Sequence, residues 1–195
     1  MKITGGTLKG RGIAVARKAG ARYTSAKVRE AIFDIIRDMG PANILDLFAG
    51  AGSFTLEALS RGAASATCVE NDTEMVEVLQ RNLATLALNK YCDVLNMDVR
   101  YAIPFLYKKG CTYDIIFMDP PYEGGYILTT MALLRDTALH KKETIFILEH
   151  SKNEPLDKMD KKTLQGIDVI VTKRYGDTVI EMLSVGNDNE KRSLR

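Results

Sequence analysis

The sequence has 195 residues, of which 46% are hydrophobic and 27% are charged, and a formal net charge of +2. This length and composition predict a single soluble globular domain with a substantial core. No apolar run is long enough to span a membrane, and residues 1–6 lack a signal-peptide core, so we expect a cytoplasmic monomer without membrane contact.

The N-terminal part of the chain is strongly basic. Eight basic residues precede the first acidic residue, Glu30, namely Lys2, Lys9, Arg11, Arg17, Lys18, Arg22, Lys27 and Arg29. Such a block is a candidate phosphate-binding face, and a solvated basic arm is the alternative. Glycines between short alternating segments in residues 2–16 predict a β-hairpin or a loosely held arm.

A helix is predicted to follow this segment. Thr24 or Ser25 can cap it, and Gly40-Pro41 ends it. Its apolar residues recur with helical spacing at Val28, Ile32, Ile35, Ile36 and Met39. Lys27 and Arg29 lie in its first turn, where positive charge opposes the helix dipole unless an anion is close. An RNA phosphate would supply that anion.

From residue 43 onward, strand and helix patterns alternate. Strands are predicted at 44–48, 66–70, 91–96, 113–118 and 144–150, and helices at 53–61, 72–88, around Pro104 and at 125–139. This alternation predicts an α/β fold with a doubly wound, mostly parallel seven-stranded sheet. Gly176-Asp177 joins the last two strands, 168–175 and 178–185, in an antiparallel hairpin. We divide the chain into a basic arm (1–23), a main domain (24–185) and a polar tail (186–195).

Asp46-Leu47-Phe48-Ala49-Gly50-Ala51-Gly52-Ser53 leaves the first predicted strand and opens a helix. Its glycines let the backbone approach a ligand, and the helix N-terminus favours a carboxylate or a phosphate. The candidate ligand contacts here are Asp46, Phe48, Gly50, Gly52 and Ser53. Thr55 occupies the position of the third glycine in the dinucleotide fingerprint, which argues against a nicotinamide cofactor.

Acidic residues also follow the second and third predicted strands, at the sheet edge where such folds bind ligands. Glu70, followed by Asn71, is placed to accept hydrogen bonds from ribose hydroxyls. Asp98, followed by Val99, could accept an adenine amino group. Taken singly, each acid is more often a strand-end polar residue or a helix cap. As an ordered set they predict a site for an adenosine with an amino-acid tail, which is the shape of S-adenosylmethionine.

Asp119-Pro120-Pro121-Tyr122 follows a buried strand. The two prolines fix the backbone, so that the Asp119 carboxylate and the Pro120 carbonyl can converge on one donor beside the Tyr122 ring. A planar amino group on an aromatic base fits this corner. The four residues alone are equally consistent with a strand-end acid followed by an ordinary proline turn.

These motifs resemble those of class I methyltransferases that act on exocyclic amino groups. Five further short segments resemble the bacterial 16S ribosomal RNA guanine-N2 methyltransferase family. They are Ile3-Thr4-Gly5-Gly6 with Lys9-Gly10-Arg11, Arg22-Tyr23-Thr24 with Val28-Arg29-Glu30, and Tyr175-Gly176-Asp177-Thr178. Tyr23 stands where the family often has proline, which leaves the rigidity of that loop open.

The resemblance implies methyl transfer from S-adenosylmethionine to the N2 amino group of a guanine in 16S rRNA, within the small subunit or its assembly intermediate. Asp119 and Pro120 would accept the amino hydrogens, and Tyr122 would stack on a flipped base. The candidate RNA contacts are Arg11, Arg22, Thr24, Lys27 and Arg29.

Three alternatives remain. A DNA adenine-N6 methyltransferase shares the tetrapeptide, but the chain has no room for a duplex-recognition insertion. An RNA-binding assembly protein with a relict cofactor pocket would not need an intact glycine loop. A nicotinamide oxidoreductase would need the third glycine and a proton-relay residue near the cleft.

The cysteines and histidines form no ligand pattern. Cys68, Cys92 and Cys111 are scattered without CxxC spacing, and His140 and His150 have no partnering pattern. We therefore expect no disulfide framework and no bound metal, and we interpret His150, at the end of a predicted strand, as structural or solvated.

Overall fold

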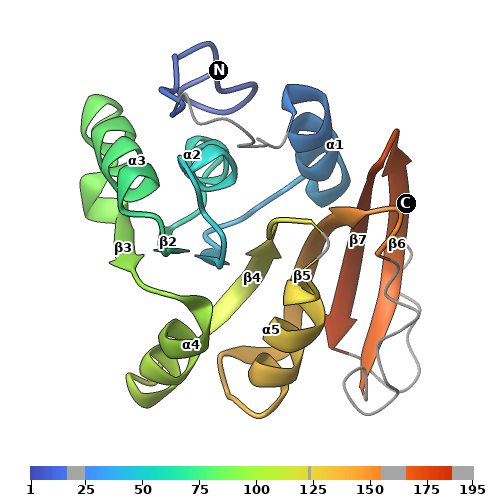
Figure 1. Cartoon of the computed structure of the whole chain (residues 1–195). Helices are drawn as coiled ribbons and strands as arrows, with labels where there is room; N and C mark the ends of the chain where they lie inside the picture. The colour runs from blue at the N-terminus through green and yellow to red at the C-terminus, as the bar shows by residue number, and fades with distance from the viewer. Residues whose placement is uncertain (17–24, 123, 155–165, 186–195) are drawn as a thin grey trace.

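The computed structural model describes residues 1–16, 25–122, 124–154 and 166–185. These residues form a seven-stranded sheet in the order β3-β2-β1-β4-β5-β7-β6, with helices on both faces (Figure 1). The first five strands in this order are parallel, and β7 runs antiparallel to both β5 and β6. The predicted doubly wound sheet with a closing hairpin is therefore confirmed. The expected arm boundary at residue 23 and the expected tail lie outside the described residues.

The strands are β1 Asn43–Asp46, β2 Ser65–Glu70, β3 Cys92–Asn96, β4 Tyr113–Met118, β5 His140–Ser151, β6 Ile167–Tyr175 and β7 Thr178–Val185. The helices are α1 Ala26–Ile36, α2 Ser53–Ser60, α3 Thr73–Thr85, α4 Val99–Lys108 and α5 Tyr126–Arg135, with a short 3-10 turn η1 at Asn89–Tyr91. No helix in the described part of the chain combines the length and apolar character that crossing a membrane requires.

Three helices end several residues before the predicted position. α1 ends at Ile36, because Arg37 adopts a positive φ of 57°. α3 ends at Thr85, and Ala87, also at positive φ, leads into η1. The helix expected at 125–139 ends at Arg135, and β5 begins at His140. The Tyr113 amide donates to the Leu139 carbonyl at 2.9 Å, which brings the start of β5 into the sheet.

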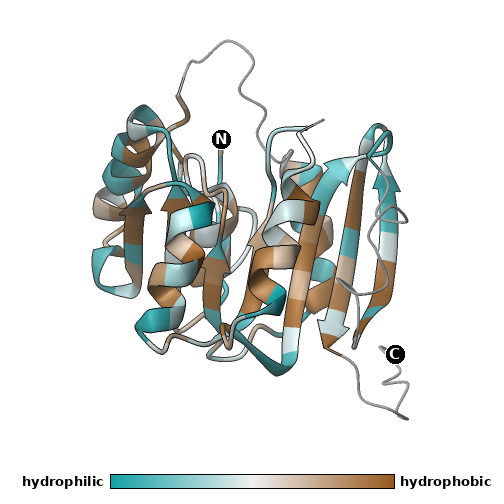
Figure 2. Cartoon of the chain, turned by 60° about the horizontal axis from the view of Figure 1, so that its bottom comes forward, coloured by the Kyte–Doolittle hydropathy of each residue, from teal (hydrophilic) through white to brown (hydrophobic). Residues whose placement is uncertain are grey.

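The sheet has one apolar core on each face. α1, α2 and α3 cover one face, where Ile44 and Phe117 are buried, and α4 and α5 cover the other, where Leu45 and Ile116 are buried. Neighbouring residues of a strand point to opposite faces, so the strands of a covered sheet are apolar on both sides. In Figure 2 the strands are mostly apolar along their middle, whereas the helices carry hydrophilic as well as apolar residues.

Residues 1–16 pack on α2 and are not a loosely held arm. Lys2 and Gly12 form one antiparallel bridge, and the Ile3 amide donates to the Arg11 carbonyl at 3.0 Å. Ile3 and Ile13 are buried in the core on the α2 side. The segment is thus a minimal hairpin that belongs to the packed domain.

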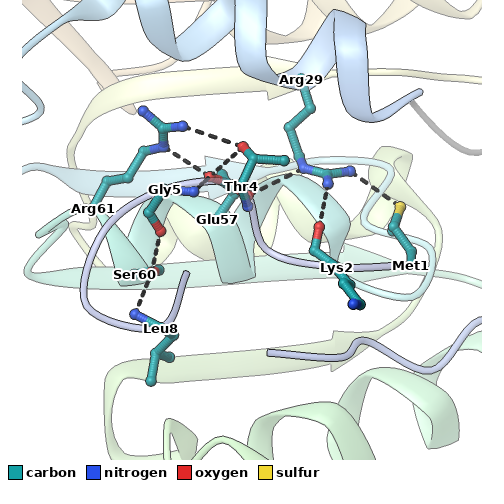
Figure 3. A network of polar contacts seen from close by, with 9 residues as sticks. All are labelled: Met1, Lys2, Thr4, Gly5, Leu8, Arg29, Glu57, Ser60 and Arg61. Carbon is teal, nitrogen blue, oxygen red and sulfur yellow. Dashed lines mark hydrogen bonds and ion pairs between the residues drawn. The ribbon is translucent and has the colours of Figure 1, made fainter. Parts of the chain in front are cut away.

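A buried carboxylate holds this segment in place (Figure 3). Glu57 on α2 accepts the Thr4 amide at 2.8 Å, the Thr4 hydroxyl at 2.8 Å and the Gly5 amide at 2.7 Å. It also forms ion pairs with Arg29 at 3.3 Å and Arg61 at 2.8 Å. Burial alone would raise the pKa of Glu57, but the Thr4 and Arg61 hydrogen bonds outweigh it and lower the pKa. We call Glu57 and these partners the N-terminal clasp.

The close approach of this segment to α2 requires a glycine at position 6. Gly6 has a φ of 73°, and a Cβ there would lie 1.9 Å from the Ser60 carbonyl oxygen. The Ser60 hydroxyl donates to the Gly5 carbonyl at 2.6 Å and accepts the Leu8 amide at 2.9 Å. The Ile3-Thr4-Gly5-Gly6 motif therefore has a structural explanation.

Candidate active site

A cavity of about 1720 Å³ opens at the carboxyl ends of the parallel strands. It is lined by residues that follow β1, β2, β3 and β4, by the end of β5, by the start of α1 and by the β6–β7 turn. The predicted site residues that line it are Lys27, Asp46, Phe48, Gly50, Ser53, Glu70, Asn71, Asp98, Val99, Asp119, Pro120, Pro121 and Tyr122. The predicted cofactor loop and the predicted catalytic tetrapeptide therefore share one cavity.

The glycine loop between β1 and α2 is held by Glu70 at the end of β2. Glu70 accepts the Gly50 amide at 2.8 Å and the Asp72 amide at 2.8 Å, one on each carboxylate oxygen. Gly52 does not line the cavity, but its φ of 85° begins α2, and a Cβ there would lie 2.3 Å from a Leu79 methyl. Gly52 therefore shapes the loop, while a Cβ at Gly50 would meet no atom within 4 Å.

Asp46 is a buried acid at the end of β1, with an exposed fraction of 1%. Oδ2 accepts the Thr55 hydroxyl at 2.8 Å, and Oδ1 has no hydrogen-bond partner among the described residues. Burial raises the pKa of Asp46 to about 7, with smaller contributions from the charges of Asp119 and Glu70. The residue that breaks the dinucleotide fingerprint, Thr55, thus orients this carboxylate.

Asp98 caps α4 and pairs with a cation. Its carboxylate accepts the Arg100 amide at 2.8 Å and the Arg100 guanidinium at 2.9 Å on each oxygen. The Arg100 hydrogen bonds lower the pKa of Asp98, which keeps the carboxylate charged. Asn71 is exposed beside Glu70, and Val99 is buried in the first turn of α4. Adenine binding by Asp98 and Val99 stays a prediction.

The tetrapeptide forms a corner directly after β4. Asp119 and Tyr122 are half-buried, Pro120 is buried and Pro121 is exposed. The Tyr122 hydroxyl lies 3.0 Å from the Thr178 hydroxyl, at the start of β7. The corner lines the cavity that is also lined by the glycine loop and Glu70, as methyl transfer from a cofactor to an amino group requires.

Several cavity residues were not found from the sequence. Tyr126, at the start of α5, packs its ring edge against Phe48 with centroids 6.2 Å apart. Glu149 is buried near the end of β5, and Lys152 and Arg174 are exposed at the cavity. Glu149 could have been found from its position in the predicted strand 144–150. The other three carry no motif of their own.

The predicted RNA contacts divide into three groups. Lys27 is exposed and lines the cavity, whereas Arg11 is exposed outside it. Arg22 and Thr24 lie outside the described residues. The prediction for Arg29 is wrong, because this side chain is fully buried in the N-terminal clasp. Its guanidinium pairs with Glu57 and donates to the Lys2 carbonyl at 2.7 Å, so it is not available to a phosphate.

The strand order, the glycine loop after β1, the acid ending β2 and the corner after β4 define the class I methyltransferase fold. A solved structure described as "Putative methyltransferase yhhF from Escherichia coli" superposes with a TM-score of 0.81 and 32% identity, covering 95% of this chain and 97% of that chain. The protein belongs to the family described as "Conserved hypothetical protein 95", which it matches over residues 1–184.

Two relatives of the chain carry names that refer to ribosomal RNA. The chain is 38% identical to "Ribosomal RNA small subunit methyltransferase D" of Escherichia coli strain K12 over 150 residues, which cover 76% of this chain and 74% of that protein. It is 31% identical to "Putative rRNA methyltransferase YlbH" of Bacillus subtilis strain 168 over 160 residues, which cover 80% of this chain and 85% of that protein.

Proposed function

We propose that this protein transfers a methyl group from S-adenosylmethionine to the N2 amino group of a guanine in 16S rRNA of the small ribosomal subunit or its assembly intermediate. The observation that carries the proposal is the single cavity that joins the glycine loop and Glu70 to the Asp119 corner. The small-subunit substrate is supported by the name of the Escherichia coli relative. The guanine N2 specificity is supported by the tetrapeptide together with the terminal motifs of the chain.

The residues at the cofactor end fit S-adenosylmethionine. Asp46 presents a buried oxygen, Oδ1, that has no hydrogen-bond partner among the described residues and suits the ammonium group of an amino-acid tail. The open space at Gly50 lets a ligand approach the loop, and Glu70 is placed for ribose hydroxyls. When bound, this cofactor supplies an electrophilic methyl group on sulfur.

The corner after β4 acts on the amino group. The guanine N2 lone pair is delocalised into the ring, so the nitrogen is a poor nucleophile. Acceptance of its two N–H bonds by Asp119 and the Pro120 carbonyl favours a pyramidal nitrogen whose lone pair points at the methyl carbon. The N–C bond forms as the S–C bond breaks, the electron pair of the S–C bond stays on sulfur, and the methylated amine releases one proton to water. Loss of one such acceptor costs about 2–4 kcal/mol of transition-state stabilisation.

The other end of the cavity receives the RNA. A paired or stacked guanine cannot reach the corner, so the nucleotide is flipped out of its helix. Stacking of the base on Tyr122 contributes about 1–3 kcal/mol. Lys27, which is exposed at the cavity on the first turn of α1, is placed to contact a flanking phosphate.

Substitution of Asp119 tests the proposal. Asp119→Asn and Asp119→Ala should bind S-adenosylmethionine in calorimetry as the wild type does. The rate of methyl transfer to small-subunit RNA should fall, because the activation free energy rises by about 2–4 kcal/mol. Mass spectrometry of nuclease digests locates the methyl group on guanine N2. Asp114→Asn is the matched control, because Asp114 carries a carboxylate on β4, the strand that leads into the corner, and does not line the cavity.

Three results would contradict the proposal. Near-wild-type transfer by both Asp119 variants would remove the assigned role of the corner. Tritium transfer to duplex DNA in preference to small subunits would indicate an adenine-N6 enzyme. Absence of S-adenosylmethionine binding by the wild type would indicate a non-catalytic RNA-binding protein.

A further inference from the structure

The turn between β6 and β7 forms part of the cavity wall beside the end of β5. β6 ends at Tyr175, β7 begins at Thr178, and Gly176 between them has a φ of 64°. Tyr175, Gly176, Asp177 and Thr178 all line the cavity. The sequence resemblance included this segment without giving it a role, and the mechanism proposed above does not use it.

The turn is attached firmly to the end of β5. The Lys152 amide donates to the Asp177 carbonyl at 2.9 Å, and the Lys152 ammonium pairs with the Asp177 carboxylate at 2.6 Å. Thr178 is also the register partner of Ser151, the last residue of β5. β5 is in turn the neighbour of β4, which carries the catalytic corner. The position of Thr178 relative to that corner is therefore fixed by the sheet itself.

One hydrogen bond connects the turn to the catalytic corner. The hydroxyl oxygens of Tyr122 and Thr178 lie 3.0 Å apart, and both side chains are half-buried at the cavity. Pro120 and Pro121 restrict the backbone before Tyr122, but they leave the rotation of its side chain free. The bond to Thr178 restricts the outer end of the ring, so that both the backbone and the ring tip of Tyr122 are held.

We propose that Thr178 is a positioning residue for methyl transfer, which holds the Tyr122 ring in the orientation on which the target base stacks. The inference rests on the function proposed above. A stacking surface that is already ordered loses less conformational freedom when the base arrives, and it keeps the amino group aligned with Asp119. Thr178 touches neither reacting group, and it acts through Tyr122.

The expected effect follows from the strength of one hydrogen bond. The net free energy of one neutral hydrogen bond corresponds to a change of roughly two- to tenfold in an equilibrium constant or a rate constant. We expect Thr178→Val, which keeps the β-branched shape, to lower the single-turnover rate by that factor. Tyr122→Phe, which keeps the ring and removes the other hydroxyl, should lower the rate by the same factor. Thr178→Ser should retain most of the wild-type rate.

A double-mutant cycle on the folded protein tests the coupling. If the two hydroxyls act as a pair, the double variant Thr178→Val with Tyr122→Phe should be no slower than either single variant. S-adenosylmethionine affinity should stay unchanged in all four proteins, because neither hydroxyl belongs to the cofactor end of the cavity. Thr172→Val is the matched control, since Thr172 is exposed on β6 and does not line the cavity.

Thr178→Val at the wild-type rate would overturn the inference, and so would rate losses that multiply in the double variant. A lower melting temperature with an unchanged single-turnover rate would assign the bond to hairpin stability alone and would also overturn it. These outcomes are distinct from failure of the proposed function, in which the wild type itself transfers no methyl group to small-subunit RNA.

Discussion

Glu57 and Asp46 are two buried carboxylates in the same β1–α2 unit, and their surroundings differ sharply. Glu57 accepts hydrogen bonds from Thr4, Gly5, Arg29 and Arg61, whereas Asp46 accepts a side-chain hydrogen bond from Thr55. The pKa of Glu57 is lowered, and that of Asp46 is raised to about 7. An acid with a full set of donors serves the fold, and an acid left with an unused buried oxygen is suited to a ligand.

The two acids therefore give stability opposite dependences on pH. Glu57 has a lowered pKa in the folded state, so its contribution is present above its ordinary value of 4.5 and is lost as the pH falls through the folded pKa. Asp46 has a raised pKa, so the folded state binds more protons than the unfolded state between pH 3.8 and about 7. Ionisation of Asp46 thus reduces stability as the pH rises through that range.

The largest effect is expected from Glu57→Gln. This change leaves the buried Arg29 guanidinium without its counter-charge, and breaking a buried ion pair costs about 3–5 kcal/mol. Urea denaturation should show that loss in the free energy of unfolding. Glu77→Gln, at an exposed position of α3, is the control and should change the free energy by less than about 0.5 kcal/mol. A loss below about 1 kcal/mol for Glu57→Gln would show that the clasp does not depend on this charge.

Asp46→Asn should change the free energy of unfolding less than Glu57→Gln does. At high pH it should stabilise the protein, whereas Glu57→Gln destabilises it. The wild type loses up to about 3 kcal/mol from this residue between pH 5 and pH 7, since each unit of pKa shift corresponds to about 1.4 kcal/mol. The variant lacks that loss, so its stability relative to the wild type should rise over the same interval. Urea denaturation at pH 5, 6, 7 and 8 measures the difference. A difference that does not change with pH would contradict the raised pKa.

The same variant tests ligand binding at Asp46. An ammonium group is bound best by the ionised carboxylate, so the affinity of the wild type for S-adenosylmethionine should increase as the pH rises through about 7. Asp46→Asn should bind more weakly and should lack this component of the pH dependence. Calorimetry in buffers of different ionisation enthalpy would detect proton release from Asp46 on binding. Equal affinities of the two proteins at pH 8 would exclude Asp46 from the site.

The difference between the two acids also explains what the sequence could and could not predict. Glu70, Asp98 and Asp119 were found because strand periodicity places strand ends at one edge of the sheet, which is a local signal combined with a general rule. Arg29 was misassigned because its charge is visible in the sequence, whereas its partner Glu57 lies on another helix. The start of β5 at His140 was missed for the same reason, since it depends on pairing with β4.

Resemblance to a family does not distinguish residues that stabilise the fold from residues that bind RNA. The Ile3-Thr4-Gly5-Gly6 and Val28-Arg29-Glu30 motifs supported the RNA assignment, yet Thr4, Gly5 and Arg29 are engaged in the N-terminal clasp. A motif shared by relatives marks a residue that matters without saying for what. Only the burial of Arg29 and its donors to Glu57 and the Lys2 carbonyl assign it to the fold.

The smallest effect is expected from Lys27→Ala, which sharpens the contrast with Arg29 two positions later in α1. Lys27 is exposed at the cavity, so its removal should leave the free energy of unfolding within about 0.5 kcal/mol of the wild type. It should raise the KM for small subunits and lower the slope of log affinity against log salt by about one, as expected for one phosphate contact. Lys142→Ala, at an exposed position outside the cavity, is the control and should change neither quantity. An unchanged salt slope for Lys27→Ala would mean that Lys27 contacts no phosphate. Arg29 is buried and cannot replace it, so other basic residues of the N-terminal block would have to bind the RNA.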